Sequence, residues 1–402
     1  MKLLKFMKKY KNSLSEITIK DLVIQNRILS SPLSINSSDR DGCASPKTIS
    51  FFENLAQNNL GIVTIGGTAV NPQGRNTVNE MWVGDKMHLP ALIQLRKSIQ
   101  KHGAKATLQL SHVGPQGNTK YNEQEVVGSS EYAIPEINII ARSLEINEIE
   151  NIENDFVKAA IMGWEAGFDF IEFQMAHGYL IHSFLSKYLN KRNDIYGQSE
   201  QNRFRIVKNI INKIKIKNKK IRLCARISGD DFVKNGLNID NLSNLIKFMD
   251  LNNFYYYTVT AGIYETAKQK YISIKSGDYW KFAKKLKTIT NTTVVAQGGI
   301  TSIDQGEELL KEGVCDIFGM CQSLIADPKI VTKTISGLEN EIYGCVAHLK
   351  VGLCHRCRYL KQKDVSFDCI TPVSWKPTDY PKKIRNINSE KWKKILTNID
   401  KI

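Results

Sequence analysis

The fold is decided by residues 168–203, which read FDFIEFQMAHGYLIHSFLSKYLNKRNDIYGQSEQNR. The apolar run at 168–173 has the length of a buried strand. It ends in a cluster of amide, imidazole and phenol side chains at Gln174, His177 and Tyr179. In a β/α barrel the chemistry takes place at the C-terminal ends of the strands. This stretch therefore predicts a βα unit that carries catalytic residues.

Length and composition favour one large globular domain. The chain has 402 residues, of which 42% are hydrophobic and 24% charged. This length exceeds the ~250 residues of a typical β/α barrel and leaves room for long loops and a tail. No apolar run approaches the ~18 residues that span a bilayer, so we expect no membrane partner. The net charge of +16 is spread along the chain without a nucleic-acid-binding motif, which predicts a lysine-rich surface and no nucleic-acid partner.

The first residues, MKLLKFMKKYKNS, are basic but lack the continuous apolar core and the small-residue cleavage site of a secretion signal. Eight cysteines in a chain without such a signal favour reduced thiols. We therefore expect a cytoplasmic protein.

Apolar segments of strand length recur along the chain. They lie at residues 28–31, 61–65, 104–110, 168–173, 221–227, 254–259, 293–297 and 314–318. Helices are predicted at 51–58, 89–102 and 147–166, the last with a capping-box-like start at Asn147 and Glu150. Residues 16–27 have the alternation of a two-stranded ribbon that plugs a barrel bottom. Residues 115–142 lack periodicity and predict a long loop on the substrate side.

A second motif follows the strand end, because residues 190–203 read NKRNDIYGQSEQNR. The two motifs together resemble the old yellow enzyme family of flavin-dependent ene-reductases. The family pattern is an apolar strand, His-x-x-(His or Asn)-Gly-Tyr, and Asn-x-Arg-x-Asp-x-Tyr-Gly-Gly-Ser-x-x-Asn-Arg. Gln174 departs from it, since the first family His is usual there. The resemblance covers about residues 15–336. It implies an α/β fold, a (β/α)8 TIM barrel over residues 1–340, with a short cysteine-containing C-terminal extension over 341–402.

The resemblance also implies FMN, bound non-covalently over the strand ends. The positions that match the family's flavin contacts are Pro32, Ser34, Gly67, Gln109, Arg226, Gly298, Gly299, Cys321 and Gln322. Ser34 keeps a hydroxyl beside the flavin C4 carbonyl, and Gln109 can pair with the pyrimidine edge because an amide both donates and accepts. Arg226 would face the N1–C2 carbonyl edge. A structural ion pair is the other interpretation of Arg226, because a charge in a buried strand needs an anionic partner.

The loop after the last predicted strand departs from the family. The family pattern there is Gly-x-Gly-Arg, whose Arg binds the FMN phosphate or lies near the ring, whereas this chain has Cys321 and Gln322. Gln322 can hydrogen-bond a phosphate but brings no charge. Gly298 and Gly299 follow the seventh strand, and the loops after strands seven and eight form the phosphate site of many β/α barrels.

The implied reaction has two halves, reduction of the flavin by NAD(P)H and transfer of hydride to the activated C=C bond of an α,β-unsaturated carbonyl. Its transition state resembles an enolate, so donors aimed at the carbonyl oxygen supply the catalysis. His177 and Gln174 are the candidate donors. Tyr179 is the candidate acid, since a phenol keeps its proton at neutral pH. Taken alone, His177 would be interpreted as a structural histidine, but its place at a strand end beside Tyr179 favours a functional role.

Two further hypotheses stay open beside the enone reductase. Gln174 and Gln322 suggest a flavin-binding redox protein with little ene-reductase activity. A dehydrogenase or demethylase on the same scaffold is the other. In each case the partner is a small molecule, and a homo-oligomer is compatible with the sequence.

Four cysteines crowd into the C-terminal extension at Cys345, Cys354, Cys357 and Cys369, with the spacing C-x8-C-x2-C-x11-C. The last three nearly match the [4Fe–4S] motif of larger relatives, and the first is displaced. Cys-x2-Cys suits one metal centre, and nearby His348 and His355 would also allow zinc. Free thiols of a remnant motif are the alternative.

Overall fold

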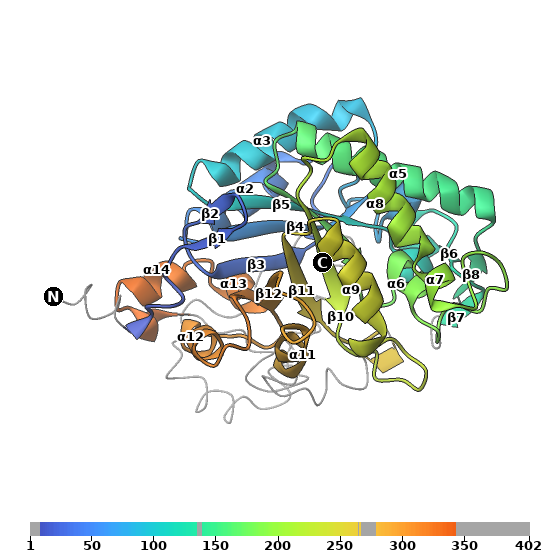
Figure 1. The fold of residues 1–402 in the computed structure, drawn as a ribbon. Helices are drawn as coiled ribbons and strands as arrows, with labels where there is room; N and C mark the ends of the chain where they lie inside the picture. Colours follow the sequence, from blue (N-terminus) through green and yellow to red (C-terminus); the bar gives the residue numbers. More distant parts are fainter. Residues whose placement is uncertain (1–8, 135–138, 264, 267–278, 343–402) are drawn as a thin grey trace, which may run out of the picture.

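The structure is a computed structural model that describes residues 9–134, 139–263, 265–266 and 279–342. Eight parallel strands close into a barrel, in which each strand pairs with the next and the last pairs with the first (Figure 1). They are β3 (Ile28–Leu33), β4 (Ile62–Ala69), β5 (Lys105–Ser111), β9 (Phe170–Met175), β10 (Leu223–Ser228), β11 (Tyr256–Thr260), β12 (Thr293–Ala296) and β13 (Ile317–Met320). This arrangement confirms the predicted (β/α)8 TIM barrel.

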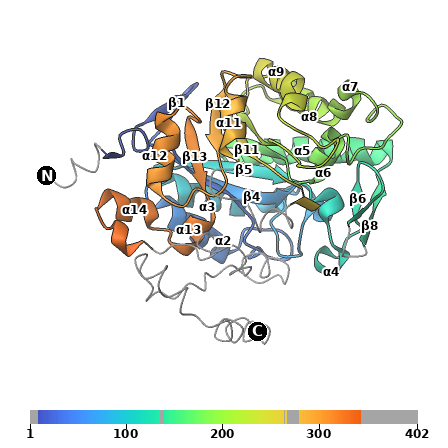
Figure 2. The ribbon, with the colours of Figure 1, turned by 90° about the horizontal axis from the view of Figure 1, so that it is seen from below.

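Helices surround the barrel, as the view from below shows (Figure 2). The longer ones are α2 (Pro46–Ala56), α3 (Leu89–Gln100), α5 (Ile146–Glu165), α8 (Arg205–Lys217), α9 (Ser243–Leu251), α11 (Trp280–Leu286) and α12 (Ile303–Lys311). Shorter ones are α4 (Thr119–Asn122), α6 (Leu180–Leu185), α7 (Glu200–Arg203), α13 (Gln322–Ala326) and α14 (Ile330–Ile335). The predicted capping box at the start of α5 is displaced by two residues, because the backbone N–H of Glu145 donates to the Glu148 carboxylate at 2.7 Å.

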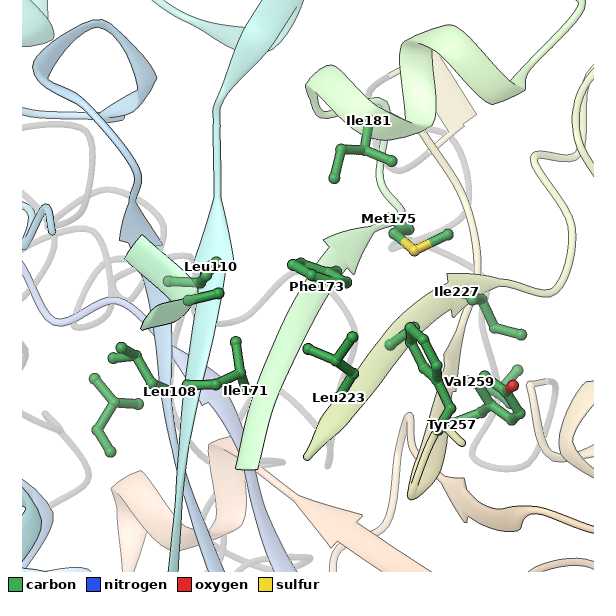
Figure 3. Close-up of a cluster of buried hydrophobic side chains, with 14 of the residues drawn as sticks. Leu108, Leu110, Ile171, Phe173, Met175, Ile181, Leu223, Ile227, Tyr257 and Val259 are labelled. Atoms are coloured by element: carbon green, nitrogen blue, oxygen red, sulfur yellow. The ribbon is translucent and has the colours of Figure 1, made fainter. Parts of the chain in front are cut away.

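The main hydrophobic core lies between the strands and the helices. Figure 3 shows part of it, where Ile171 and Phe173 of β9 lie beside Leu223 of β10 and Tyr257 of β11. These side chains point outward from the barrel, and alternate residues of the same strands point inward. Burial on both faces explains why the strands read as nearly continuous apolar runs.

A separate apolar layer fills the bottom of the barrel interior. Its members come from every barrel strand except β5 and are Leu29, Ile62, Phe170, Cys224, Tyr256, Val295 and Ile317. Ile19 of β1 (Ile17–Ile19) and Ile24 of β2 (Leu22–Ile24) pack against it from below. The antiparallel β1–β2 ribbon is therefore the predicted plug.

A polar layer lies above the apolar one, because residues two positions further along each strand face the same way. We call it the polar ring; its members are Ser31, Thr64, Gln109, Glu172, Arg226, Thr258, Gln297 and Gly319. Apart from Arg226, which is partly exposed, they are buried. Hydrogen-bonding groups therefore line the bottom of the C-terminal mouth of the barrel.

The barrel closes where β13 pairs with β3. Glu307 of α12 secures the nearby N-terminal segment and is itself buried. Its carboxylate accepts hydrogen bonds from the Ser13 backbone N–H and hydroxyl, both at 2.7 Å, and from the Asn12 amide at 2.8 Å. These hydrogen bonds connect the beginning of the described chain to α12, one of its last helices.

The segment predicted as a long loop is partly ordered into a small sheet. It consists of β6 (Val127–Gly128), β7 (Tyr132–Ile134) and β8 (Ile139–Ser143). Arg192 of the second motif donates to the carbonyl oxygens of Ser129 and Leu144, at 2.9 and 2.6 Å, which fastens the sheet to the loop after α6. The prediction failed because strands of two to five residues are too short to show alternation.

Candidate functional site

The turn after β9 carries the three predicted catalytic residues. Gln174 is the penultimate residue of the strand, and Tyr179 stands directly before α6. Between them His177 has a φ of 64° and Gly178 a φ of 79°. Such a backbone is uncommon for a residue with a side chain, and it is often found at functional turns. The turn brings the His177 and Tyr179 rings together edge to face, with centroids 6.1 Å apart.

The Gln174 side chain has a defined orientation. Its Oε1 accepts a hydrogen bond from the Ala176 backbone N–H at 3.2 Å. Because a backbone N–H only donates, the amide oxygen must face Ala176, and the NH2 group is the end that can serve another acceptor. This orientation is the one that the predicted donor role of Gln174 requires.

A hydrogen bond from β11 orients the His177 ring. Nε2 lies 2.9 Å from Oγ1 of Thr260, the last residue of that strand. Thr260 was not identified from the sequence, since a threonine at a strand end has no distinguishing pattern. Only the closed barrel places β11 within reach of the turn that follows β9.

Glu172 is the centre of a buried network beneath these residues. Its Oε1 accepts from Gln109 Nε2 at 2.7 Å, and its Oε2 accepts from the Thr258 hydroxyl at 2.8 Å. Gln109 in turn accepts from the Gly67 backbone N–H at 3.2 Å. Burial raises the pKa of Glu172, while the Thr258 bond, the Arg226 charge and the Gln109 bond act in the opposite direction.

Arg226 lies in the polar ring, level with Gln174 on one neighbouring strand and with Thr258 on the other. Its charge acts on the Glu172 carboxyl, so the anionic partner that the sequence required is inside the barrel. Arg222 has a different position, because β10 begins one residue after it. Arg222 pairs with Asp21 at 2.8 Å and, with Tyr255, lowers the Asp21 pKa to about 2.

The remaining predicted flavin contacts gather at the same mouth. Pro32 and Leu33 are the last two residues of β3. The Ser34 hydroxyl donates to Asn36 Oδ1 at 3.3 Å. Gly67 has a φ of 65°, and a Cβ there would lie 2.6 Å from Glu80 Oε1 and 3.0 Å from Ser34 Cβ. Local packing therefore requires a glycine at position 67, because Glu80 and Ser34 occupy the space of a side chain and the backbone has a positive φ.

Two loops at the opposite side of the mouth carry the predicted phosphate contacts. Gly298 and Gly299 follow β12 with φ values of 97° and 69°. The Gly298 carbonyl accepts from Trp280 Nε1 at 2.8 Å, which anchors this loop to α11. Cys321 and Gln322 follow β13, and Gln322 begins the short helix α13. The polar ring and these loops offer buried hydrogen-bond donors and acceptors, as a cofactor with a hydroxylated chain and a phosphate requires.

His112 lies just after β5 and is an ionisable residue that the sequence did not assign. Its Nδ1 accepts from the Gly114 backbone N–H at 3.0 Å, and burial lowers the His112 pKa to about 3. The folded-state pKa is thus below the unfolded value of ~6.5. Its contribution to stability is complete above pH ~6.5 and is lost as the pH falls toward 3.

Replacing His112 with Asn, which keeps an acceptor for Gly114, is expected to reduce acid sensitivity. The free energy of unfolding of the native protein decreases between pH 8 and pH 5, and the buried neutral His112 accounts for about 2 kcal/mol of this decrease. Urea unfolding at both pH values measures this difference. His102→Asn, at a partly exposed site beside Glu53, is the control. Parallel pH dependences for His112→Asn and the native chain would refute the assignment.

The cysteines predicted to bind a metal, Cys345, Cys354, Cys357 and Cys369, lie outside the described residues. Within the described part of the chain, no group of three or more potential ligands could hold a metal ion. Likewise, no helix in that part has the length and apolar character needed to cross a bilayer. The boundary between barrel and extension at residue 340 stays a prediction.

Comparison with known proteins decides the family. Residues 15–341 match the NADH:flavin oxidoreductase / NADH oxidase family. The chain belongs to this family. The predicted resemblance to the old yellow enzyme family is therefore confirmed. The prediction that the chain is an oxidoreductase of that type is confirmed at the level of the family.

Three relatives illustrate the match. NADPH dehydrogenase of Bacillus subtilis is 31% identical over 330 residues, which cover 81% of this chain and 95% of that protein. NADH oxidase of Thermoanaerobacter brockii is 31% identical over 346 residues, 85% of this chain and 53% of that one. A solved 2-naphthoyl-CoA reductase complex with 2-naphthoyl-CoA has a TM-score of 0.83 and 25% identity, and covers 90% of this chain and 56% of that one. The chain spans about half the length of the last two.

Proposed function

We propose that this chain is an FMN-dependent oxidoreductase that takes hydride from NAD(P)H and passes it to the activated C=C bond of an α,β-unsaturated carbonyl. The observation that carries the proposal is the turn after β9. It holds Gln174, His177 and Tyr179 together at the mouth of the barrel, directly above the network of Gln109 and Glu172. Family membership supports the flavin and the nicotinamide.

FMN bound at this mouth would accept a hydride from the nicotinamide and donate one to the alkene. Gln109 and Arg226 would hold its pyrimidine edge, and Ser34 its C4 carbonyl. The loops at Gly298, Gly299 and Gln322 would hold the phosphate.

The protein's own contribution to the reaction is hydrogen bonding and proton delivery at the substrate. The Gln174 NH2 group and the His177 imidazole donate to the carbonyl oxygen, where negative charge develops in the transition state. The Thr260 bond at 2.9 Å keeps the imidazole in place for this contact. Tyr179 delivers its phenol proton to the α carbon on the face opposite to hydride addition.

Stopped-flow measurement of the two half-reactions tests the proposal. Flavin absorbance is followed first on mixing with NADH or NADPH and then on mixing the reduced protein with 2-cyclohexenone. We expect bleaching in the first experiment and recovery without oxygen in the second. Reduction without recovery by any enone would favour a flavin-binding redox protein with little ene-reductase activity.

Gln322→Arg is expected to tighten FMN binding by roughly 3- to 30-fold, because a charge-assisted phosphate contact is stronger than a neutral one. Fluorescence titration of flavin-free protein measures the dissociation constant. Riboflavin, which lacks the phosphate, is the control ligand and should bind both proteins equally. An FMN affinity that does not increase would mean that Gln322 faces away from the phosphate.

A further inference from the structure

The two sides of the polar ring differ in hydrogen bonding. On one side Gln109, Glu172 and Thr258 satisfy one another. On the other side the Gln297 carboxamide is only 3% exposed, yet neither its oxygen nor its nitrogen has a hydrogen-bond partner among the described residues. The buried Thr64 hydroxyl is in the same situation. Buried amides are nearly always satisfied in native proteins, by protein, water or ligand, so Gln297 points to a group that binds there.

The position of Gln297 is set by the glycine on the next strand. A Cβ at Gly319 would lie 2.8 Å from Gln297 Cγ and 2.9 Å from Gln297 Nε2, and 2.8 Å from the Ser31 hydroxyl. Gly319 therefore lets the Gln297 side chain lie across β13 toward β3. The carboxamide is held inside the mouth, immediately before Gly298 and Gly299.

Gln297 lies between the two ends of the proposed cofactor site. Arg226 of β10 is two strands away, or about 10 Å at the usual spacing of ~4.8 Å between strands. The glycines of the proposed phosphate loop follow Gln297 directly. The part of FMN that connects ring and phosphate is the ribityl chain, whose hydroxyls both donate and accept. A carboxamide matches them, since it presents one group of each kind.

We propose that the Gln297 carboxamide binds the ribityl hydroxyls of the flavin. This inference rests on the proposed function, because it requires FMN at the barrel mouth. It makes Gln297 a cofactor-binding residue that distinguishes flavins with the polyol chain from those without it.

Flavin titrations of the full chain after removal of bound flavin test the inference. Gln297→Leu and the native protein are compared with FMN, riboflavin and lumiflavin, which lacks the ribityl chain. We expect Gln297→Leu to weaken FMN and riboflavin equally, by about 5- to 30-fold for one or two lost hydrogen bonds. Lumiflavin binding should not change. The melting temperature of the flavin-free protein should stay equal or rise, because leucine removes a buried amide without a partner.

Gln322→Leu is the matched variant and is expected to weaken FMN alone, since riboflavin has no phosphate. If Gln297→Leu also weakened the binding of FMN alone, Gln297 would lie at the phosphate and the inference would be wrong. Equal weakening of lumiflavin, unchanged binding of all three flavins, or a lower melting temperature of flavin-free Gln297→Leu would also overturn it. If the native protein binds no FMN, the proposed function itself is wrong. If native binding is tight and Gln297→Leu has no effect, only this inference fails.

Discussion

Tyr179→Phe is expected to slow reoxidation of the reduced flavin by an enone about 10²- to 10⁴-fold, the usual contribution of a positioned acid. Only the proton donor is removed, because the ring that contacts His177 edge to face is retained. Reduction by NAD(P)H should be nearly unchanged, since no α carbon is protonated in that half. Stopped-flow traces of the two half-reactions measure both effects.

Tyr188→Phe is the matched control, because Tyr188 lies on the segment after α6, where Lys191 rather than His177 faces its ring. It should leave both half-reactions intact. If Tyr179→Phe slows the reductive half and spares the oxidative half, the roles assigned along the turn after β9 are wrong.

Arg226→Ala is expected to raise the FMN dissociation constant roughly 10- to 100-fold, the worth of a lost charge-assisted hydrogen bond. The substitution also removes a positive charge that lowers the pKa of buried Glu172, so the pKa of this carboxyl should rise further. Fluorescence titration of flavin-free protein measures the affinity.

Arg222→Ala controls for loss of an arginine from the same segment. Arg222 pairs with Asp21 outside β10, and its removal should not affect flavin affinity. Native FMN binding by Arg226→Ala would support the alternative interpretation of Arg226 as a structural partner of Glu172.

Residues close in sequence made much of the site predictable. Gln174, His177 and Tyr179 lie within six positions at the end of one strand, so a local pattern contains them. The barrel itself was also predictable, because its strands are buried on both faces and read as separate apolar runs. Strand ends were less accurate. β13 was predicted at 314–318 and lies at Ile317–Met320, because Gly319 reads as a turn residue but lies inside the strand.

The missed residues depend on contacts between strands. Glu172 interrupts the apolar run at 168–173, and Arg226 interrupts the run at 221–227. Opposite charges inside two predicted strands could have indicated that these residues interact. A single charge in a strand is equally compatible with a side chain that faces solvent. Only the register of β9 in the barrel places the Glu172 side chain in the barrel interior. Thr260 and Gln297 have no local signal at all. Their importance follows from the closed barrel, which sets β11 beside the β9 turn and leaves Gln297 among buried groups.

The seam between β3 and β13 has a consequence for how the protein is made. The proposed flavin site draws on residues from Pro32 to Gln322, and the first strand of the barrel stays unpaired on one side until the last has been synthesised. At ~5–20 residues per second a ribosome takes roughly 15 s to 1 min over this interval. The nascent chain therefore carries an open strand edge for that time, and the proposed site is complete only after Gln322 has been added, with 80 residues still to follow. We therefore expect FMN to bind late in synthesis or after it, so that cellular FMN supply affects the stability of the finished barrel rather than the folding of its emerging half.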